Sequence, residues 1–245
     1  MTVSGANSLW FNSASLIVGE AGQGTLSITA GGRVQNTLFG AVGGSAGPGT
    51  VTVSGASSQW VNSAGLFVGS LGQGTLDITA GGVVQNTGGT VGLNFGSTGT
   101  VTVSGANSQW VNSGDLVVGN SGEGVLNISV GDFGQGTLNI TAGGKVTSAI
   151  GVIAAQPSGS GLATVTGAGS TWTNTNDLFV GGNSTIGRGD GTLRVERGGM
   201  VLVADVLTIY DTGTLAVGPL GGHRQRPDHR RLRHARRHAR GIAAR

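Results

Sequence analysis

The chain has 245 residues, of which 50 are glycine, 10% are charged and 4% are aromatic. It has no cysteine, which excludes disulfide bonds and thiolate metal sites, and no run of the ~18 apolar residues that a membrane-spanning helix needs. The net charge of +3 hides a change of sign, because residues 1–220 carry five basic and ten acidic side chains, whereas residues 221–245 carry nine arginines and one aspartate.

A repeated unit of about 50 residues dominates the sequence. The pattern T-V-T-V-S-G-A-[NS]-S-Q-W-V-N-S occurs at residues 50–63 and 100–113, and weaker copies lie at residues 2–13 and 164–175. One tryptophan stands in each copy: Trp10, Trp60, Trp110 and Trp172. A period of this size predicts stacked repeats rather than a compact domain with a single pocket.

The repeated unit divides again into two similar units. Gly49 and Gly74 begin the related segments GTVTV and GTLDI, which are 25 residues apart. Further starts of this kind are at Gly24, Gly99, Gly136, Gly191 and Gly213, with Thr164 in the same register. Residues 1–220 therefore predict a β-solenoid of about nine ~25-residue coils, each made of two or three strands and stacked about 4.8 Å apart.

Short strands are expected within each coil. Apolar residues spaced by two, such as Val51/Val53 and Leu66/Val68, alternate with Thr, Ser, Asn or Asp. This spacing places the apolar side chains on the inner face and the polar ones on the outer face, and the Gly-rich segments between them form turns. A β-sandwich or a propeller is the competing fold, but neither accounts for the 25-residue subdivision.

The pattern is interrupted between Gly122 and Gly136. The segment GEGVLNI is followed at once by GQGTLNI, a local duplication that adds 12 residues. Either a loop projects from the solenoid here or the register of the coils is broken.

The segments VTVSGANSQWVNSGDLVVGNSGEG and GTLNITAGGKV resemble repeats in the passenger regions of bacterial autotransporters, the type V secretion family. The resemblance covers about residues 2–218. It implies a right-handed parallel β-helix that is displayed on the outer membrane of a Gram-negative bacterium or secreted. It also implies a role in adhesion, aggregation or biofilm formation.

The sequence departs from that family at both ends. It has no export signal at its N-terminus and no C-terminal translocating β-barrel. We therefore expect a passenger-domain fragment, whose contact with a membrane would depend on the missing barrel.

The Arg/His-rich tail, residues 221–245, has neither strand alternation nor Gly-Thr turns. A frameshifted gene end is the favoured interpretation, because Arg/His/Ala runs are typical of GC-rich DNA read out of frame. A disordered tail is the second interpretation, and a nucleic-acid or metal site at His229, His234 and His238 is the third. We expect no nucleic-acid partner.

Two motifs are candidate binding residues. Trp10, Trp60, Trp110 and Trp172 would form a row of sugar-stacking platforms if they point outward, although packing in the core or at a corner is favoured. Arg188, Gly189 and Asp190 spell an integrin-binding tripeptide in a Gly-rich turn, and such a short motif also arises by chance.

The polar repeats favour structure over catalysis. A glycosidase needs two carboxylates about 5–10 Å apart. The candidate carboxylates are dispersed along the sequence, which favours a role in solubility: Asp77, Asp115, Asp132, Asp177, Asp190 and Glu196. Residues 1–220 contain no histidine or cysteine, so a Ser–His–Asp or Cys–His site has no base. An asparagine follows each tryptophan by two positions and is expected to form a hydrogen-bonded ladder or a left-handed turn: Asn12, Asn62, Asn112 and Asn174.

The sequence thus predicts an all-β, right-handed parallel β-helix over residues 1–220, with no catalytic residues, cofactor or metal. We expect a non-enzymatic scaffold on the cell surface or outside the cell, which acts in adhesion, aggregation or biofilm formation by binding host or bacterial glycans or proteins. The alternative is a polysaccharide-binding or polysaccharide-degrading β-helix. End coils without polar caps also predict end-to-end self-association.

Overall fold

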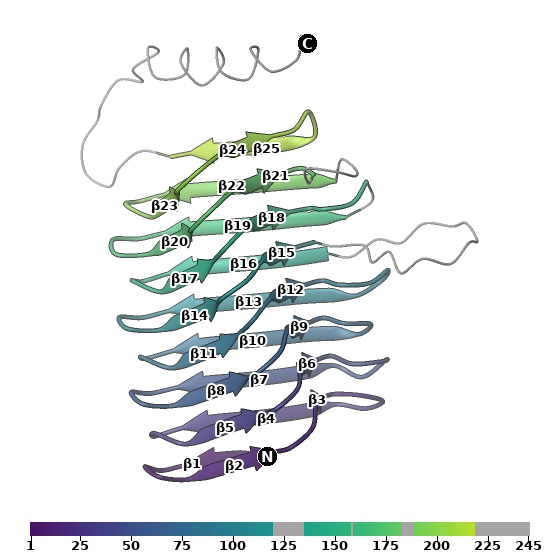
Figure 1. The fold of residues 1–245 in the computed structure, drawn as a ribbon, viewed down its shortest axis with the longest axis vertical. Helices are drawn as coiled ribbons and strands as arrows, with labels where there is room; N and C mark the ends of the chain where they lie inside the picture. Colours follow the sequence, from purple (N-terminus) through teal and green to yellow (C-terminus); the bar gives the residue numbers. More distant parts are fainter. Residues whose placement is uncertain (120–134, 158, 183–188, 219–245) are drawn as a thin grey trace.

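A computed structural model describes residues 1–119, 135–157, 159–182 and 189–218 of the chain. These residues form a β-solenoid, in which 25 short strands wind into three parallel sheets that run along the rod (Figure 1). The described residues contain no helix, and therefore none that could cross a membrane. The predicted all-β solenoid is confirmed, and its right-handed sense stays a prediction.

Sheet A is the longest of the three and has nine strands. Its strands, in spatial order, are β1 (Thr2–Ser4), β4 (Gly24–Thr29), β7 (Gly49–Ser54), β10 (Gln73–Thr79), β13 (Thr98–Ser104), β16 (Gln135–Thr141), β19 (Ser160–Thr166), β22 (Asp190–Glu196) and β25 (Gly213–Val217).

Sheet B has eight strands of four residues each. They are β2 (Leu9–Asn12), β5 (Arg33–Asn36), β8 (Gln59–Asn62), β11 (Val83–Asn86), β14 (Gln109–Asn112), β17 (Lys145–Ser148), β20 (Thr171–Asn174) and β23 (Met200–Val203).

Sheet C has eight strands of three residues each. They are β3 (Leu16–Val18), β6 (Gly40–Val42), β9 (Leu66–Val68), β12 (Gly89–Val91), β15 (Leu116–Val118), β18 (Gly151–Ile153), β21 (Leu178–Val180) and β24 (Leu207–Ile209).

Each coil takes one strand from each sheet, so that coil 1 is β1–β3 and coil 8 is β22–β24. The described residues complete eight coils, and β25 is the first strand of a ninth. Alternation along each strand decides which side chains face inward. In coil 3, Val51, Val53, Leu66 and Val68 are fully buried, as their spacing predicts.

The register of sheet A continues across the duplicated segment. Strand β16 lies directly on β13, with Gly99 opposite Gly136 and Thr100 opposite Thr137. The second of the two copies, GQGTLNI, supplies this strand, while residues 120–134 lie outside the described residues. The possibility of a broken register is therefore wrong for sheet A.

Large and small side chains alternate from coil to coil in the core. In sheet B, Trp60 lies between Val34 and Val84, and Trp110 lies between Val84 and Val146. In sheet C, the odd-numbered coils carry leucine where coils 2, 4 and 6 carry glycine: Leu16, Gly40, Leu66, Gly89, Leu116, Gly151 and Leu178.

The glycines leave the room that the tryptophans fill. A Cβ atom added at Gly89 would lie 2.7 Å from Trp110 Cζ2 and 2.9 Å from Leu116 Cδ1. Gly40 faces Trp60 in the same way, and Gly151 faces Trp172. Trp60, Trp110 and Trp172 therefore each pack over the glycine of the preceding coil, which explains why the sequence repeats every 50 residues and not every 25.

A polar ladder runs inside the core beside the tryptophans. Trp110 Nε1 donates a hydrogen bond to Asn86 Oδ1 (2.8 Å), and Asn86 Nδ2 donates one to Asn112 Oδ1. In the next pair of coils Ser148 replaces the asparagine, because its hydroxyl accepts from Trp172 Nε1 (3.2 Å) and donates to Asn174 Oδ1 (2.7 Å). The predicted asparagine ladder is thus confirmed at Asn62, Asn112 and Asn174, each of which accepts a hydrogen bond from the preceding coil. Asn12 instead donates to the carbonyl oxygens of its own turn.

Buried serines fix the corner between sheets A and B. The Ser58 hydroxyl donates to the Ser54 carbonyl oxygen (2.8 Å) and accepts from the Gly31 N–H of the preceding coil (3.0 Å). Ser108 and Ser170 make the same pair of bonds two and four coils further along. Neighbouring coils are therefore joined at this corner by side chains as well as by the sheets.

The glycine–tryptophan packing predicts that Gly89→Ala destabilises the protein by about 1–3 kcal/mol through overpacking. Gly88→Ala is the matched control, since its Cβ would meet only the Asp115 carbonyl oxygen at 3.4 Å. Both changes restrict the unfolded chain equally, so the difference isolates the crowding. Urea unfolding followed by tryptophan fluorescence measures it, and equal stability of the two variants would contradict the packing.

The polar ladder predicts that Asn86→Ala costs more stability than Asn86→Ser. Alanine leaves Trp110 Nε1 without an acceptor and Asn112 Oδ1 without this donor, at about 1–3 kcal/mol for each unsatisfied buried group. Serine can imitate Ser148. Thermal unfolding followed by circular dichroism should rank the wild type first, Asn86→Ser second and Asn86→Ala last; a serine variant no better than alanine would refute the ladder's role.

Candidate functional site

The outer face of each sheet carries a different chemistry. On sheet A, between β4 and β16, fifteen outward side chains form three ranks of five along the rod, which we call the hydroxyl face. The first rank is Thr25, Thr50, Thr75, Thr100 and Thr137; the second is Ser27, Thr52, Asp77, Thr102 and Asn139; the third is Thr29, Ser54, Thr79, Ser104 and Thr141. A shorter outward row of Gln73, Thr98 and Gln135 borders the first rank. Asp77 is the only charged member of the three ranks, so this face is polar, regular and nearly uncharged.

The outer face of sheet B is less regular. Its first outward position holds, from coil 1 to coil 6, Leu9, Arg33, Gln59, Val83, Gln109 and Lys145. Cationic, amide and apolar side chains follow one another without a fixed order. This face therefore offers local sites rather than one repeated surface.

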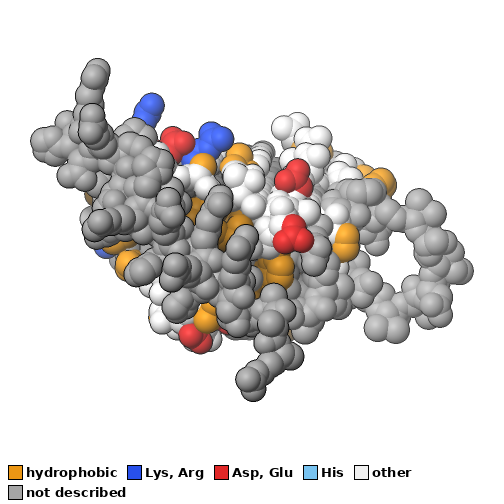
Figure 2. Space-filling model, turned by 90° about the horizontal axis from the view of Figure 1, so that it is seen from above, with side chains coloured by type: hydrophobic (Ala, Val, Ile, Leu, Met, Phe, Trp, Pro, Cys, Tyr) orange, Lys and Arg blue, Asp and Glu red, His pale blue; other side chains and the backbone are white. Residues whose placement is uncertain are grey.

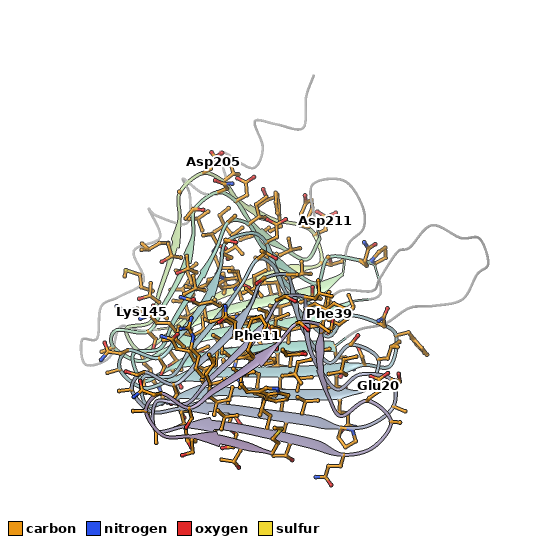
Figure 3. The ribbon with its side chains drawn as sticks, turned by 60° about the horizontal axis from the view of Figure 1, so that its bottom comes forward. Phe11, Glu20, Phe39, Lys145, Asp205 and Asp211 are labelled. Carbon is orange, nitrogen blue, oxygen red and sulfur yellow. The ribbon has the colours of Figure 1, made fainter. Side chains whose placement is uncertain are left out.

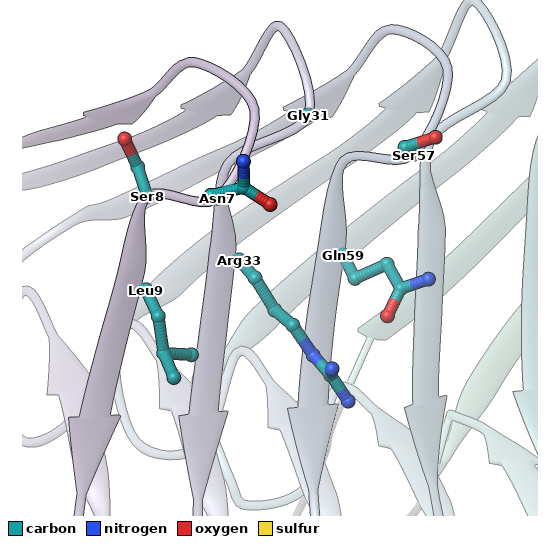
Figure 4. Close-up of a pocket in the computed structure, with 7 residues that line it drawn as sticks. All are labelled: Asn7, Ser8, Leu9, Gly31, Arg33, Ser57 and Gln59. Atoms are coloured by element: carbon teal, nitrogen blue, oxygen red, sulfur yellow. The ribbon is translucent and has the colours of Figure 1, made fainter.

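A shallow depression of about 350 Å³ lies at the N-terminal end of sheet B. Figure 4 shows Arg33 extended between Leu9 and Gln59, with Asn7, Ser8 and Ser57 at the turns above them. The depression combines one guanidinium, two side-chain amides and one exposed leucine. Such a set can bind a carboxylate that is attached to a partly apolar ring.

The outer face of sheet C is narrow and mostly apolar. Its single outward rank begins with Ile17, Ala41 and Phe67. Phe39 covers part of this rank, because its ring packs edge-on against Phe67 with 5.8 Å between the centroids. Further along, Phe179 packs near Tyr210 (6.4 Å), and burial raises the pKa of the tyrosine above its ordinary value. These aromatic pairs mainly cover the thin core.

The tryptophans lie inside the rod and are not ligand platforms. Trp60, Trp110 and Trp172 have no exposed surface, and Trp10 is half-buried at the N-terminal end. An outward row of sugar-stacking rings is therefore wrong for Trp60, Trp110 and Trp172, because each of these indoles is fully buried and faces a glycine of the preceding coil. The favoured packing interpretation is the one that the structure supports.

The predicted integrin-binding tripeptide is described only in part. Arg188 lies outside the described residues. Gly189 is buried, whereas Asp190 is exposed at the first position of β22. A Cβ at Gly189 would meet the backbone of Ala154 and Gln156, so only Asp190 of the two described residues is accessible to a partner.

The carboxylates are distributed over different coils and faces. Asp115 and Asp177 precede β15 and β21, with a whole coil between them. Asp177 Oδ1 accepts a hydrogen bond from the Val206 N–H (3.0 Å), which is a structural role. Glu196 pairs with Arg194 at 3.6 Å on the exposed surface.

No group of metal-binding side chains gathers among the residues that the structure describes. Figure 3 shows the charged residues that it labels on different sides of the rod: Glu20, Lys145, Asp205 and Asp211. Asp132 and the three tail histidines considered as ligands, His229, His234 and His238, lie outside the described residues.

Both ends of the described rod expose apolar side chains. At the N-terminal end Leu9 is 58% exposed and Phe11 is 56% exposed, and Phe11 lies at this end in Figure 3. At the other end, which faces the viewer in Figure 2, exposed residues include Leu207 and Val217.

The sequence predicted Thr, Ser and Asn on the outer faces but not their arrangement in ranks. The G-T-x-T-x-S segments, in which every second residue carries a hydroxyl group, could have predicted these ranks. The depression around Arg33 had no comparable signal, since Asn7, Arg33 and Gln59 come from three successive coils.

Comparison with protein-family models, with curated proteins and with solved structures finds no significant match to this chain. The β-solenoid fold therefore stands on the structure itself.

Proposed function

We propose that this protein is a non-enzymatic scaffold, displayed on the cell surface or secreted, that acts in adhesion, aggregation or biofilm formation. We further propose that it is the passenger region of an autotransporter, on the resemblance of its repeats. The observation that carries the scaffold role is that the same outward side chain repeats on successive coils: the first rank of sheet A is threonine at every coil from Thr25 to Thr137.

Repetition favours binding through many weak contacts. Identical groups on successive coils are about 4.8 Å apart, so a polymeric or densely packed partner can engage several of them at once. Once one contact forms, the next is intramolecular, and the combined affinity exceeds that of any single contact. A stiff rod assists this because its groups are already ordered before binding.

The distribution of ionisable groups supports a non-enzymatic role. General acid–base catalysis needs two or more such groups within reach of one reacting bond. Asp77, Asp115 and Asp177 belong to three different coils, and although Asp190 and Glu196 share β22, Glu196 is paired with Arg194.

A polysaccharide-binding or polysaccharide-degrading protein is the second candidate, and the depression around Arg33 favours it. Arg33 carries the charge that an acidic sugar would need, and Gln59 and Asn7 carry amides that can bind hydroxyl groups. Leu9 offers apolar surface for the face of a sugar ring.

A glycan array tests both candidates with the full chain. Scaffold function predicts signals that rise steeply with the density of the immobilised glycan, because more contacts then form at once. If the depression recognises acidic sugars, Arg33→Gln should lose most of that signal. Lys145→Gln is the matched control, because Lys145 occupies the same outward rank of sheet B outside the depression.

The outcomes separate the hypotheses. Equal loss in the two variants indicates general charge attraction and removes the depression as a site. Release of shortened oligosaccharides from an acidic polysaccharide would overturn the non-enzymatic proposal.

End-to-end association is a further prediction of the rod. Strands β1, β2 and β3 each have one unpaired edge, and Leu9 and Phe11 are exposed beside it. Light scattering of the full chain should show mass that increases with concentration. The double variant Leu9→Lys/Phe11→Lys should reduce it by charge repulsion and lost apolar contact, and a wild type that stays monomeric at high concentration would contradict the prediction.

A further inference from the structure

We propose that the hydroxyl face of sheet A, from β4 to β16, binds ice. This inference goes beyond the adhesion proposal and does not depend on it. It starts from one observation: in the three ranks of this face every position except Asp77 and Asn139 carries a Thr or Ser hydroxyl group.

The hydroxyl face has two regular repeats. Along the rod, equivalent residues such as Thr50, Thr75 and Thr100 lie on neighbouring strands about 4.8 Å apart, whereas along a strand Thr50 and Thr52 are two residues and about 6.7 Å apart. The repeat along the rod lies close to the shortest oxygen–oxygen lattice repeat of hexagonal ice, which runs within its basal plane. Water molecules held between the ranks can therefore continue into an ice lattice.

The threonine side chain suits this role for two reasons. Its hydroxyl group can anchor a water molecule, while its methyl group orders the water around it without competing for hydrogen bonds. Its branched Cβ also restricts χ1, so that the positions of these groups vary little. The first rank consists of threonine alone from coil 2 to coil 6.

The face is held rigid from beneath and within. Its inward neighbours, such as Val51, Leu76 and Val101, are fully buried and stacked in register. Within the third rank, the Thr79 hydroxyl donates to the Ser54 hydroxyl at 3.0 Å. Strands β4 to β16 keep nearly the same direction in Figure 1. A rigid face loses little entropy on binding a crystal.

Other solid or polymeric partners fit this face less well. It carries no aromatic side chain on which a sugar ring could stack, and Asp77 is its only charge. The regular pattern ends beyond β16, where Leu162 replaces threonine in the first rank and Arg194 and Glu196 follow in the second and third. The outer faces of sheets B and C lack such a lattice.

Partition into ice tests the proposal with the full chain. A fluorescently labelled protein is placed around a slowly growing ice hemisphere, and the fluorescence in the ice is compared with that of the liquid. We expect enrichment for the wild type. Thr52→Tyr/Thr102→Tyr should abolish it, because two bulky rings in the second rank lift the lattice away from the face.

The matched control is Val61→Tyr/Val111→Tyr, which places the same rings on the outer face of sheet B in the same two coils and outside the depression around Arg33. It should keep the enrichment of the wild type. Circular dichroism melting checks that both double variants fold, since both positions are on the surface.

Two results would overturn the proposal. One is exclusion of the wild type from ice, and the other is equal enrichment of both double variants. Binding to cellulose or chitin that Thr52→Tyr/Thr102→Tyr abolishes, together with exclusion from ice, would assign the face to a crystalline polysaccharide instead. A wild type that binds no glycan on the array but is enriched in ice would support ice binding and contradict the adhesion role.

Discussion

The packing of Trp60, Trp110 and Trp172 over a glycine of the preceding coil is the constraint on which the rest of the structure depends. A solenoid whose strands have three to seven residues encloses a core only a few side chains wide, so each layer must fill the gaps of its neighbour. Trp110 over Gly89 and Trp172 over Gly151 do this by pairing the largest side chain with none at all. Two kinds of coil must therefore alternate, and any change in one of them affects the coil before or after it.

The same constraint separates the interior from the surface. Because inward positions are fixed by tryptophan, leucine, glycine and the polar ladder, the outward positions can vary without disturbing the fold. The outward positions of sheet A repeat threonine, whereas those of sheet B hold charged, amide and apolar side chains. Sheet C carries phenylalanines on its outer face. Among the residues that the structure describes, the surfaces available for binding are therefore these faces and the ends of the rod.

The candidate surfaces show how far sequence reasoning reached. Spacing by two correctly assigned inward and outward residues, and the step of two from tryptophan to asparagine correctly suggested a ladder. Spacing alone did not decide whether the tryptophans point inward or outward, because the residue after Trp60 is also apolar. The direction becomes clear only from the residues that lie opposite on the neighbouring strands. Gly89 opposite Leu116 and Val84 opposite Trp110 supply that knowledge. The depression at Arg33 was missed for a similar reason, because it joins residues of three coils.

The sequence by itself determined the repeat, the 25-residue coil, the alternation of strands and turns and the solenoid fold, since all of these follow from periodicities within one or two repeats. The tertiary structure decided the rest. It showed that each coil has three strands, that GQGTLNI continues sheet A, and that the tryptophans are enclosed. Those outcomes depend on which side chains meet between coils, and contacts between residues about 25 positions apart arise only when the coils stack.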